Sequence, residues 1–385
     1  MPYLPPEPPR RILCVVAARP NLMKMAPILQ ALRQIAPAVE LPLLHTGQHY
    51  DEAMDADFFP TLALPAPDFR LEVGSGSHAL QTAEVLRRIE PVLDQVRPGA
   101  LLVVGDVNST LACALAAAKK NIAVFHVEAG LRSFDRSMPE EINRVLTDQL
   151  SELLFTSEPS GLNNLLHEGI PSSRIHFVGN VMIDTLLQQL PRATPVADLL
   201  RRLNLAGFVE PGEPYALLTL HRPSNVDDPL RLRSLMETTV RLSTHLPVIF
   251  PLHPRTRAML THFGLHAMLD SPRVACLPPL AYLDMLGLMK AARMVLTDSG
   301  GVQEETTALS VPCLTLRDNT ERPITVNEGS NAIAGRDPAV ILALCRDILQ
   351  YGGKAGRTPQ YWDGHAAERI AGAIATWLDG LRERR

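Results

Sequence analysis

Short apolar runs alternate with longer amphipathic stretches along the first half of this chain. The runs are rich in β-branched residues and have the length of strands, while the amphipathic stretches have the spacing of helices. Strands that alternate with helices are typical of a parallel sheet with helical crossovers. We therefore predict a doubly wound α/β domain. Its strands are expected at 11–17, 40–45, 101–105, 122–127, 152–156 and 174–178, and its helices at 23–34, 78–96, 109–119, 140–151 and 160–168.

The same alternation restarts after a break, marked by prolines and a glycine, between residues 190 and 214. We predict an α/β fold of two doubly wound, Rossmann-like domains that face a central cleft. Residues 11–190 form the first domain and 191–364 the second, a C-terminal helix at 365–385 completes the first, and residues 1–10 form a flexible proline-rich tail. The strands of the second domain are expected at 215–220, 247–252, 274–277, 294–297, 312–316 and 331–334.

Three acids follow apolar runs or begin a helix in the first half: Asp106, Glu128 and Glu140. Since ligands of open α/β sheets bind where the strands end, these carboxylates are candidates for acid/base chemistry. Asp106 can equally be a turn former, and Glu140, with Glu141, can be a first-turn acid that complements the helix dipole. Glu128 fits such structural roles less well, because a helix cap at this place would normally be Ser, Asp or Asn.

The segment 295–305 carries the strongest signal for anion binding. A strand ends there, Ser299, Gly300 and Gly301 allow close approach to the backbone, and a helix begins with its free amides toward the loop. This geometry suits a pyrophosphate, and Glu305, one turn further on, can accept hydrogen bonds from ribose hydroxyls. The alternative is an ordinary helix start with Ser299 as its N-cap.

Basic residues and a histidine stand at other strand ends. Arg19 follows the first strand, Lys24 lies in the next helix, and Arg322 belongs to a Thr-Glu-Arg-Pro segment, so each can meet a phosphate. His221 ends the strand at 215–220 and can act as a general acid or as a donor to a phosphate leaving group. It can also simply hydrogen-bond the loop backbone. No histidine has a second ligand at metal spacing, so we predict no metal site.

Composition narrows the function further. The length of 385 residues suits two domains, and 46% hydrophobic with 20% charged residues is typical of a globular protein. A net charge of -4 provides no basic field for a nucleic acid. The five cysteines form no CxxC pair, which favours free thiols in a reducing cytoplasm. The sequence shows no signal peptide and no apolar run long enough to cross a membrane.

Taken together, eight segments resemble the non-hydrolysing UDP-N-acetylglucosamine 2-epimerases, which have the two-domain GT-B fold. They occur in the family's order over nearly the whole chain. The segments are Ala18-Arg-Pro-Asn-Leu-Met-Lys-Met-Ala-Pro27, Thr46-Gly-Gln-His49, Gly105-Asp-Val-Asn-Ser-Thr110, His126-Val-Glu-Ala-Gly-Leu-Arg-Ser133, Pro139-Glu-Glu-Ile-Asn-Arg144, Leu220-His-Arg222, Thr297-Asp-Ser-Gly-Gly-Val-Gln-Glu-Glu305 and Arg317-Asp-Asn-Thr-Glu-Arg-Pro323.

The resemblance implies interconversion of UDP-N-acetylglucosamine (UDP-GlcNAc) and UDP-N-acetylmannosamine (UDP-ManNAc) by elimination and re-addition of UDP, through 2-acetamidoglucal. It implies no cofactor, a homodimer, and a cytoplasmic role in supplying surface polysaccharide synthesis. By matching position, the catalytic residues are Asp106, Glu128, Glu140 and His221. The substrate and UDP are expected to be bound by Arg19, Lys24, Arg144, Ser299, Gly300, Gly301, Glu305 and Arg322.

Departures from the family pattern bear on regulation and on the substrate. Members with an allosteric substrate site often carry Gln-His-Arg where this chain has Gln48-His-Tyr50, so we do not expect activation by the substrate. The segments 221–227 and 253–257 resemble a branch that includes epimerases of UDP-2,3-diacetamido-sugar uronic acids, so a modified UDP-HexNAc is the nearest rival substrate. The sequence is also compatible with a hydrolysing epimerase, a retaining glycosyltransferase or a non-catalytic nucleotide-sugar-binding protein.

Overall fold

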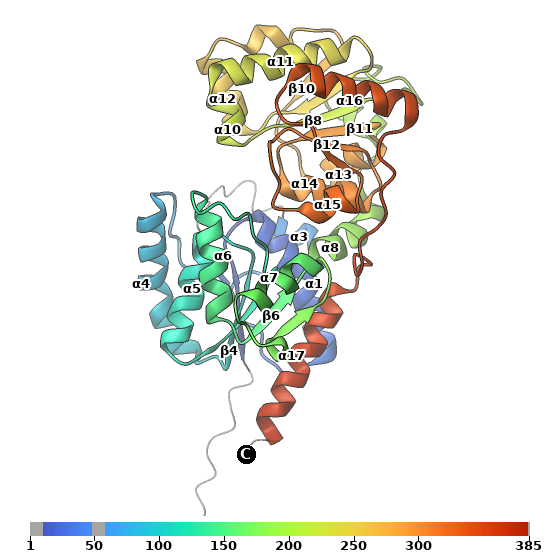
Figure 1. Ribbon diagram of the computed structural model, residues 1–385. Coiled ribbons are helices and arrows are strands. Elements are labelled where there is room, and N and C mark those ends of the chain that lie inside the picture. Colours follow the sequence, from blue (N-terminus) through green and yellow to red (C-terminus); the bar gives the residue numbers. More distant parts are fainter. Residues whose placement is uncertain (1–10, 48–57, 384–385) are drawn as a thin grey trace, which may run out of the picture. The chain divides into compact units, whose positions relative to one another are not determined.

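The computed structural model describes residues 11–47 and 58–383, which form two compact units. Unit 1 comprises the described residues of Met1–Thr185 together with Gln360–Arg385, and unit 2 is Leu186–Pro359 (Figure 1). Each unit contains a parallel sheet with helices on its faces, which confirms the predicted α/β fold class. The predicted tail at 1–10 and the Gln48-His-Tyr50 segment lie outside the described residues.

The sheet of unit 1 has seven strands in the order β3-β2-β1-β4-β5-β6-β7. Most of them are continuous apolar runs, as expected for strands that are buried on both faces. The two-residue strand β3 at one edge was not predicted. The strands are β1 (Ile12–Val16), β2 (Leu43–His45), β3 (Phe69–Arg70), β4 (Ala100–Val104), β5 (Ala123–Val127), β6 (Leu153–Thr156) and β7 (Ile175–Phe177).

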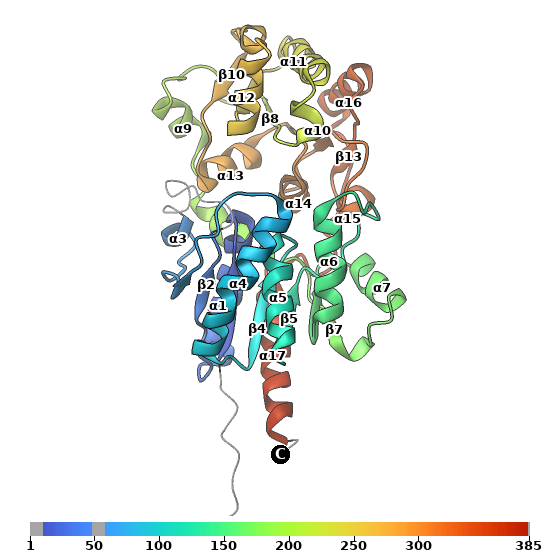
Figure 2. The same cartoon turned by 90° about the vertical axis from the view of Figure 1, so that its left-hand side faces the viewer.

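Helices cover both faces of this sheet. One face packs on α4, α5 and α6, which lie in front of the strands in Figure 2, and the other on α1 and α17. Phe125 of β5 contacts Trp377 of α17 edge-on, with ring centroids 5.0 Å apart. The helices are α1 (Arg19–Ile35), α3 (Phe58–Thr61), α4 (His78–Val96), α5 (Asn108–Lys119), α6 (Pro139–Leu150), α7 (Pro159–His167), α8 (Val181–Gln189) and α17 (Ala366–Glu383), and α8 contains the boundary between the units.

Unit 2 has a six-stranded sheet in the order β10-β9-β8-β11-β12-β13. Its main core lies between these strands and α11, α12 and α16. The strands are β8 (Ala216–Thr219), β9 (Val248–Pro251), β10 (Val274–Leu277), β11 (Met294–Thr297), β12 (Cys313–Thr315) and β13 (Asn331–Ile333). The helices are α9 (Val196–Arg202), α10 (Pro223–Val226), α11 (Pro229–Ser243), α12 (Pro254–His262), α13 (Tyr282–Ala291), α14 (Gly300–Ala308), α15 (Pro323–Asn327) and α16 (Pro338–Tyr351).

Local signals explain several element boundaries. The side chains of Ser77 and Asp228 accept amide hydrogen bonds at the starts of α4 and α11, as N-caps do. α17 begins where Asp184 accepts the amides of Ala366 and Ala367, at 3.2 and 2.7 Å, which fastens the C-terminal helix to unit 1. Among the described residues, no helix has both the length and the apolar composition of a membrane span.

Candidate active site

The strand order of unit 1 reverses between β1 and β4, and open parallel sheets bind ligands at the carboxyl ends of the strands at such a point. Asp106 follows β4, and Glu128 follows the neighbouring strand β5. The register pairs Val104 with Val127, so the segments that leave these two strands are adjacent. α1, which follows β1, begins at Arg19. Three segments with predicted site residues therefore meet at one edge of the sheet.

Glu128 lies in a tight turn directly after β5. Its φ of 71° falls in the left-handed region, which costs a non-glycine residue about 1–2 kcal/mol. Hydrogen bonds of 3.0 Å from the amides of Glu128 and Ala129 to the carbonyl of Phe155 hold the turn. The carboxylate of Glu128 forms an ion pair with Lys24 of α1, and both side chains are buried. Lys24, a predicted phosphate ligand, thus lies against a predicted catalytic acid.

Asp106 is held by the guanidinium of Arg144. Arg144 donates to Asp106 through Nε at 2.9 Å, and its Nη1 donates to Glu141 at 2.9 Å, so one buried cation bridges two carboxylates. Burial would raise the pKa of Glu141, but hydrogen bonds from Ser133 and Phe134 and the charge of Arg144 hold it below its ordinary value. The arrangement keeps the Asp106 carboxylate, which is 24% exposed, in a fixed position at the edge of the sheet.

The other predicted residues of unit 1 begin helices. Glu140 is the second residue of α6 and is half-buried, one position before the buried Glu141. Arg19 is the first residue of α1 and is also half-buried. The structure thus brings Lys24 to Glu128 and Arg144 to Asp106. It places Arg19 and Glu140 in the first turns of α1 and α6, which begin at the same edge of the sheet.

Unit 2 has its own reversal of strand order, between β8 and β11. His221 follows β8 and Asp298 follows β11, and the register pairs Thr219 with Thr297 just before them. Nδ1 of His221 lies 3.0 Å from the buried carboxylate of Asp298. This carboxylate also accepts the amide of His221 at 3.1 Å and that of Arg222 at 3.0 Å. Asp298 therefore fixes both the loop and the ring of His221.

The same contacts favour the ionised form of the Asp298 carboxylate. Burial opposes ionisation, but the hydrogen bond and charge of His221, the amide of Arg222 and the side chain of Asn225 hold the pKa of Asp298 below its ordinary value. With Nδ1 turned to this acceptor, the other edge of the half-exposed ring of His221 is the one left to meet a ligand.

The backbone at the start of α14 has features that allow a ligand to approach it closely. Ser299 occupies the N-cap position, as the alternative interpretation of this segment expected, but its side chain makes no capping hydrogen bond. A Cβ on Gly300 would lie 3.0 Å from Oε1 of Glu321, whereas one on Gly301 would meet open space. The first amides of the helix are thus bordered by a glycine on its open side, where an anion can reach them.

Buried charge pairs surround this helix. Arg322 pairs with Glu304 of α14 at 3.0 Å. Glu321 pairs with Arg317 at 2.8 Å and with Arg222 at 3.2 Å. Burial would raise the pKa of Glu321, but these cations lower it to about 2.

Glu305, further along α14, is buried and accepts the hydroxyl of Tyr282 at 3.0 Å. Its carboxylate is therefore oriented from one side by a phenol.

Arg144, which orients Asp106, was predicted only as a ligand of the substrate, and three further buried residues, Asp298, Glu321 and His126, were not predicted as site residues. Asp298 has the sequence signal only of a polar strand end, although its position after β11, beside β8, links it to His221 once the strand order is known. Glu321 is distinguished in the sequence only as a member of the Thr-Glu-Arg-Pro segment. His126 has no distinguishing sequence pattern, but it is fully buried and bonded at both ring nitrogens.

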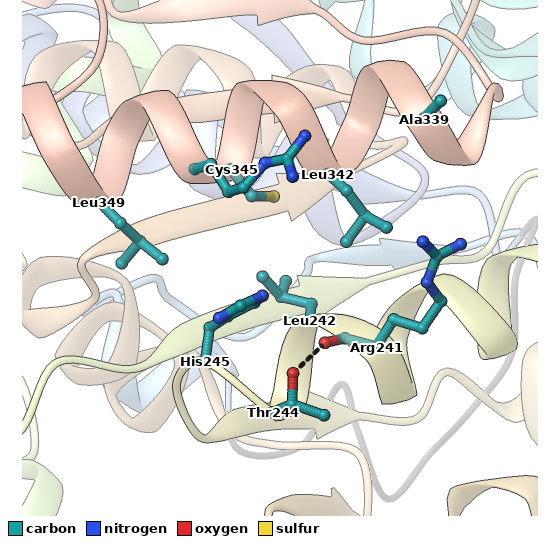
Figure 3. A pocket seen from close by; sticks show the side chains of 9 residues that line it. Arg241, Leu242, Thr244, His245, Ala339, Leu342, Cys345 and Leu349 are labelled. Carbon is teal, nitrogen blue, oxygen red and sulfur yellow. Dashed lines mark hydrogen bonds between the residues drawn. The ribbon is translucent and has the colours of Figure 1, made fainter.

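A separate hollow of about 300 Å³ lies in unit 2 between α16 and the end of α11 (Figure 3). Leucine side chains from both helices point into it, and Thr244 donates to the carbonyl of Arg241 at its border. None of the predicted site residues lines this hollow. In each unit the candidate site residues therefore lie at the strand-order reversal of that unit and not at this cavity.

Comparison with known proteins gives one consistent result. Residues 30–375 match the family model described as UDP-N-acetylglucosamine 2-epimerase. A UDP-N-acetylglucosamine 2-epimerase of Methanococcus maripaludis is 44% identical over 94% of this chain and 96% of its own. A UDP-2,3-diacetamido-2,3-dideoxy-D-glucuronate 2-epimerase of Pseudomonas aeruginosa is 39% identical over 95% and 99% of the two chains. The crystal structure of Methanocaldococcus jannaschii UDP-GlcNAc 2-epimerase in complex with UDP-GlcNAc and UDP is similar with a TM-score of 0.86, at 42% identity, covering 95% of this chain and 99% of that one.

Proposed function

This chain belongs to the UDP-N-acetylglucosamine 2-epimerase family and is an isomerase, as its motifs predicted, and we propose that it interconverts UDP-GlcNAc and UDP-ManNAc by elimination and re-addition of UDP. The observation that carries the proposal is the match to a named epimerase at 44% identity over 94% of the chain. The acids and the helix start at the two strand-order reversals support it.

The reaction consists of two steps, an elimination of UDP and its re-addition. In the first, a base removes the proton from C2 of the sugar while the bond between C1 and the UDP oxygen breaks, which yields UDP and 2-acetamidoglucal. In the second, a proton is added to the opposite face of C2 and the UDP oxygen bonds to C1 again. No electrons are exchanged with a third compound, so the reaction needs no redox cofactor.

Unit 1 supplies the proton transfers in this proposal. Glu128, whose carboxylate is positioned by its ion pair with Lys24, is one candidate to accept the proton. Asp106, oriented by Arg144, and Glu140, at the start of α6, are the other carboxyls that take or return protons. Positioned carboxyl groups of this kind typically contribute about 10²- to 10⁴-fold to a rate.

Unit 2 binds the leaving group, UDP, in this proposal. The amides at Gly300 and Gly301 and the positive end of the α14 dipole suit the pyrophosphate of UDP. His221, with Nδ1 held by Asp298, is oriented to donate to the departing phosphate oxygen. We expect Glu305 to accept ribose hydroxyls, and Arg322, Arg19 and Ser299 complete the proposed nucleotide set.

The test is to incubate the purified protein with UDP-GlcNAc in heavy water and to follow the proton spectrum. We expect UDP-ManNAc to appear with deuterium at C2. Epimerised product without deuterium would contradict proton removal from C2. Release of free N-acetylmannosamine would instead show a hydrolysing epimerase, and binding of UDP-GlcNAc without any turnover would show a non-catalytic protein.

A second substrate is favoured by one observation, the 39% identity to the P. aeruginosa epimerase of a diacetamido uronate. The two candidates are separated by measuring kcat/KM for UDP-GlcNAc and for UDP-2,3-diacetamido-2,3-dideoxy-D-glucuronate with the same preparation. A ratio above ten in favour of either sugar assigns the substrate.

We also propose a homodimer, on family resemblance, and a cytoplasmic role in supplying activated N-acetylmannosamine to surface polysaccharide. The location is supported by the five free cysteines, four of them buried, which suit a reducing compartment. Light scattering coupled to size exclusion tests the dimer. A monomer at working concentration would contradict it.

A further inference from the structure

His126 is a fully buried histidine whose two ring nitrogens both have hydrogen-bond partners. It lies on β5 and faces the side of the sheet covered by α5 and α6, since Phe125 beside it faces α17. Nε2 lies 2.8 Å from the carbonyl of Gly105, the residue before Asp106. Nδ1 lies 2.6 Å from the carboxylate of Asp148 on α6.

These partners define the protonation state of the ring. A carbonyl oxygen can only accept, so Nε2 must carry a proton. Asp148 accepts the amide of Gly130 and Nη2 of Arg132, so it acts as an acceptor throughout this cluster. Nδ1 of His126 is then the donor in the contact with Asp148. The geometry thus has both ring nitrogens of His126 donating hydrogen bonds.

Asp148 extends the contact to the second catalytic turn. Its other oxygen accepts the amide of Gly130 at 3.0 Å and Nη2 of Arg132 at 2.7 Å. Gly130 stands two residues after Glu128 and has a φ of 79°, and a Cβ there would lie 2.3 Å from the carbonyl of Gly161. This close-packed turn continues from the strained backbone of Glu128. One buried pair thus bonds to the backbone beside both Asp106 and Glu128.

We propose that His126, together with Asp148, is a positioning residue that holds the turns carrying Asp106 and Glu128 in register for proton transfer. This inference rests on the proposed function of the two acids. The need for it follows from geometry: Gly105 and Glu128 both have left-handed φ angles, near 70°, so neither turn is held by intrinsic preference. A displacement of about 1 Å in a reacting group can cost about 10²-fold in rate.

The experiment compares variants that each keep one half of the contact. In His126→Gln the side-chain amide can replace Nε2 and still donate to Gly105, while in His126→Asn it can replace Nδ1 and donate only to Asp148. Asp148→Asn keeps the shape of the pair but removes the ionised acceptor. The control is Asp184→Ala, which weakens the start of α17 in the same unit and touches neither turn.

For each folded variant, kcat and KM for UDP-GlcNAc, the Kd of UDP and the melting temperature are measured. We expect His126→Asn to lower kcat at least about tenfold, and His126→Gln to lower it less, with the Kd of UDP within about twofold of wild type. Asp184→Ala should lower the melting temperature and leave kcat within about twofold. A wild-type kcat in His126→Asn, with only a lower melting temperature, would overturn the inference, because it would show a purely structural role.

A second measurement does not depend on any variant remaining folded. With ¹⁵N-labelled histidine in the wild-type protein, both ring nitrogens of His126 should show the shifts of nitrogens that carry a proton. A ring nitrogen without a proton would overturn the pair of donated hydrogen bonds. Failure of the proposed function is distinguishable, since it would appear as absence of epimerisation in wild type and in the Asp184→Ala control alike.

Discussion

Replacing Gly301 by alanine should raise the stability of unit 2 while weakening its hold on UDP. Gly301 is the second residue of α14, and a Cβ built on it meets no atom within 4 Å. Its φ is not among the left-handed values of the chain, so alanine fits the backbone. The added methyl group stands at the open side of the helix start, where we propose that the pyrophosphate of UDP meets the amides.

The magnitudes of the gain in stability and of the loss in affinity for UDP can both be estimated. Alanine in place of a helical glycine is worth about 0.5–1 kcal/mol in stability, which corresponds to a rise of about 1–4 °C in melting temperature for a unit of this size. Displacing a phosphate from one or two amides removes hydrogen bonds to a charged group, worth about 1.5–3 kcal/mol. The Kd of UDP should then rise about 10- to 100-fold.

Calorimetry supplies both quantities, as a melting scan without ligand and as a titration with UDP. The matched control is Gly372→Ala in α17, where a Cβ also meets open space. That variant should gain stability in unit 1 and bind UDP like wild type. An unchanged Kd of UDP in Gly301→Ala, with a raised melting temperature, would refute the assignment of the pyrophosphate to the start of α14.

Two further predictions concern unit 1. The variants Asp106→Asn, Glu128→Gln and Glu140→Gln should each lower kcat by about 10²-fold or more while UDP still binds, as steady-state kinetics and titration can establish; near-wild-type kcat in all three would remove these acids from the chemistry. Burial raises the pKa of Asp184 to about 6, so the pH-dependent part of this group's contribution to folding is complete below about pH 4 and is lost as the pH rises through 6. The free energy of unfolding of Asp184→Asn, relative to wild type, should therefore increase by up to about 3 kcal/mol between pH 4 and 7, followed in denaturant by the fluorescence of the two tryptophans, which both lie in unit 1; a difference independent of pH would contradict the raised pKa.

The secondary structure followed closely from hydrophobic periodicity where the signals were strong. The helix predicted at 78–96 and the strand predicted at 294–297 have the same bounds as α4 and β11. α1 begins at Arg19 and not at 23, because Pro20 fits the first turn of a helix, where no amide is needed. β3 and α8 were missed, since a two-residue edge strand and a nine-residue helix leave little periodic pattern.

The identities of the candidate acids were readable in the sequence, but their partners were not. Lys24 was expected at a phosphate because it is a cation after a strand, and its pairing with Glu128 depends on which strands are neighbours. The same holds for Arg144 and Asp106, which are joined through the contact of α6 with the end of β4. Strand order arises from the packing of the whole sheet, so one amino-acid sequence alone could not supply these pairs.

The charge pairs also decide which substitutions can test nucleotide binding. Arg322 is buried against Glu304, so removing its charge would leave a carboxylate that is 2% exposed without this partner. Loss of such a partner typically costs about 3–5 kcal/mol, and a lower activity of that variant would not separate binding from folding. Gly301 belongs to no charge pair. A Cβ at this position meets open space, and alanine stabilises a helix relative to glycine. If the helix amides and His221 hold the pyrophosphate, the mildest substitution at this site should be the one that weakens UDP binding without a cost in stability.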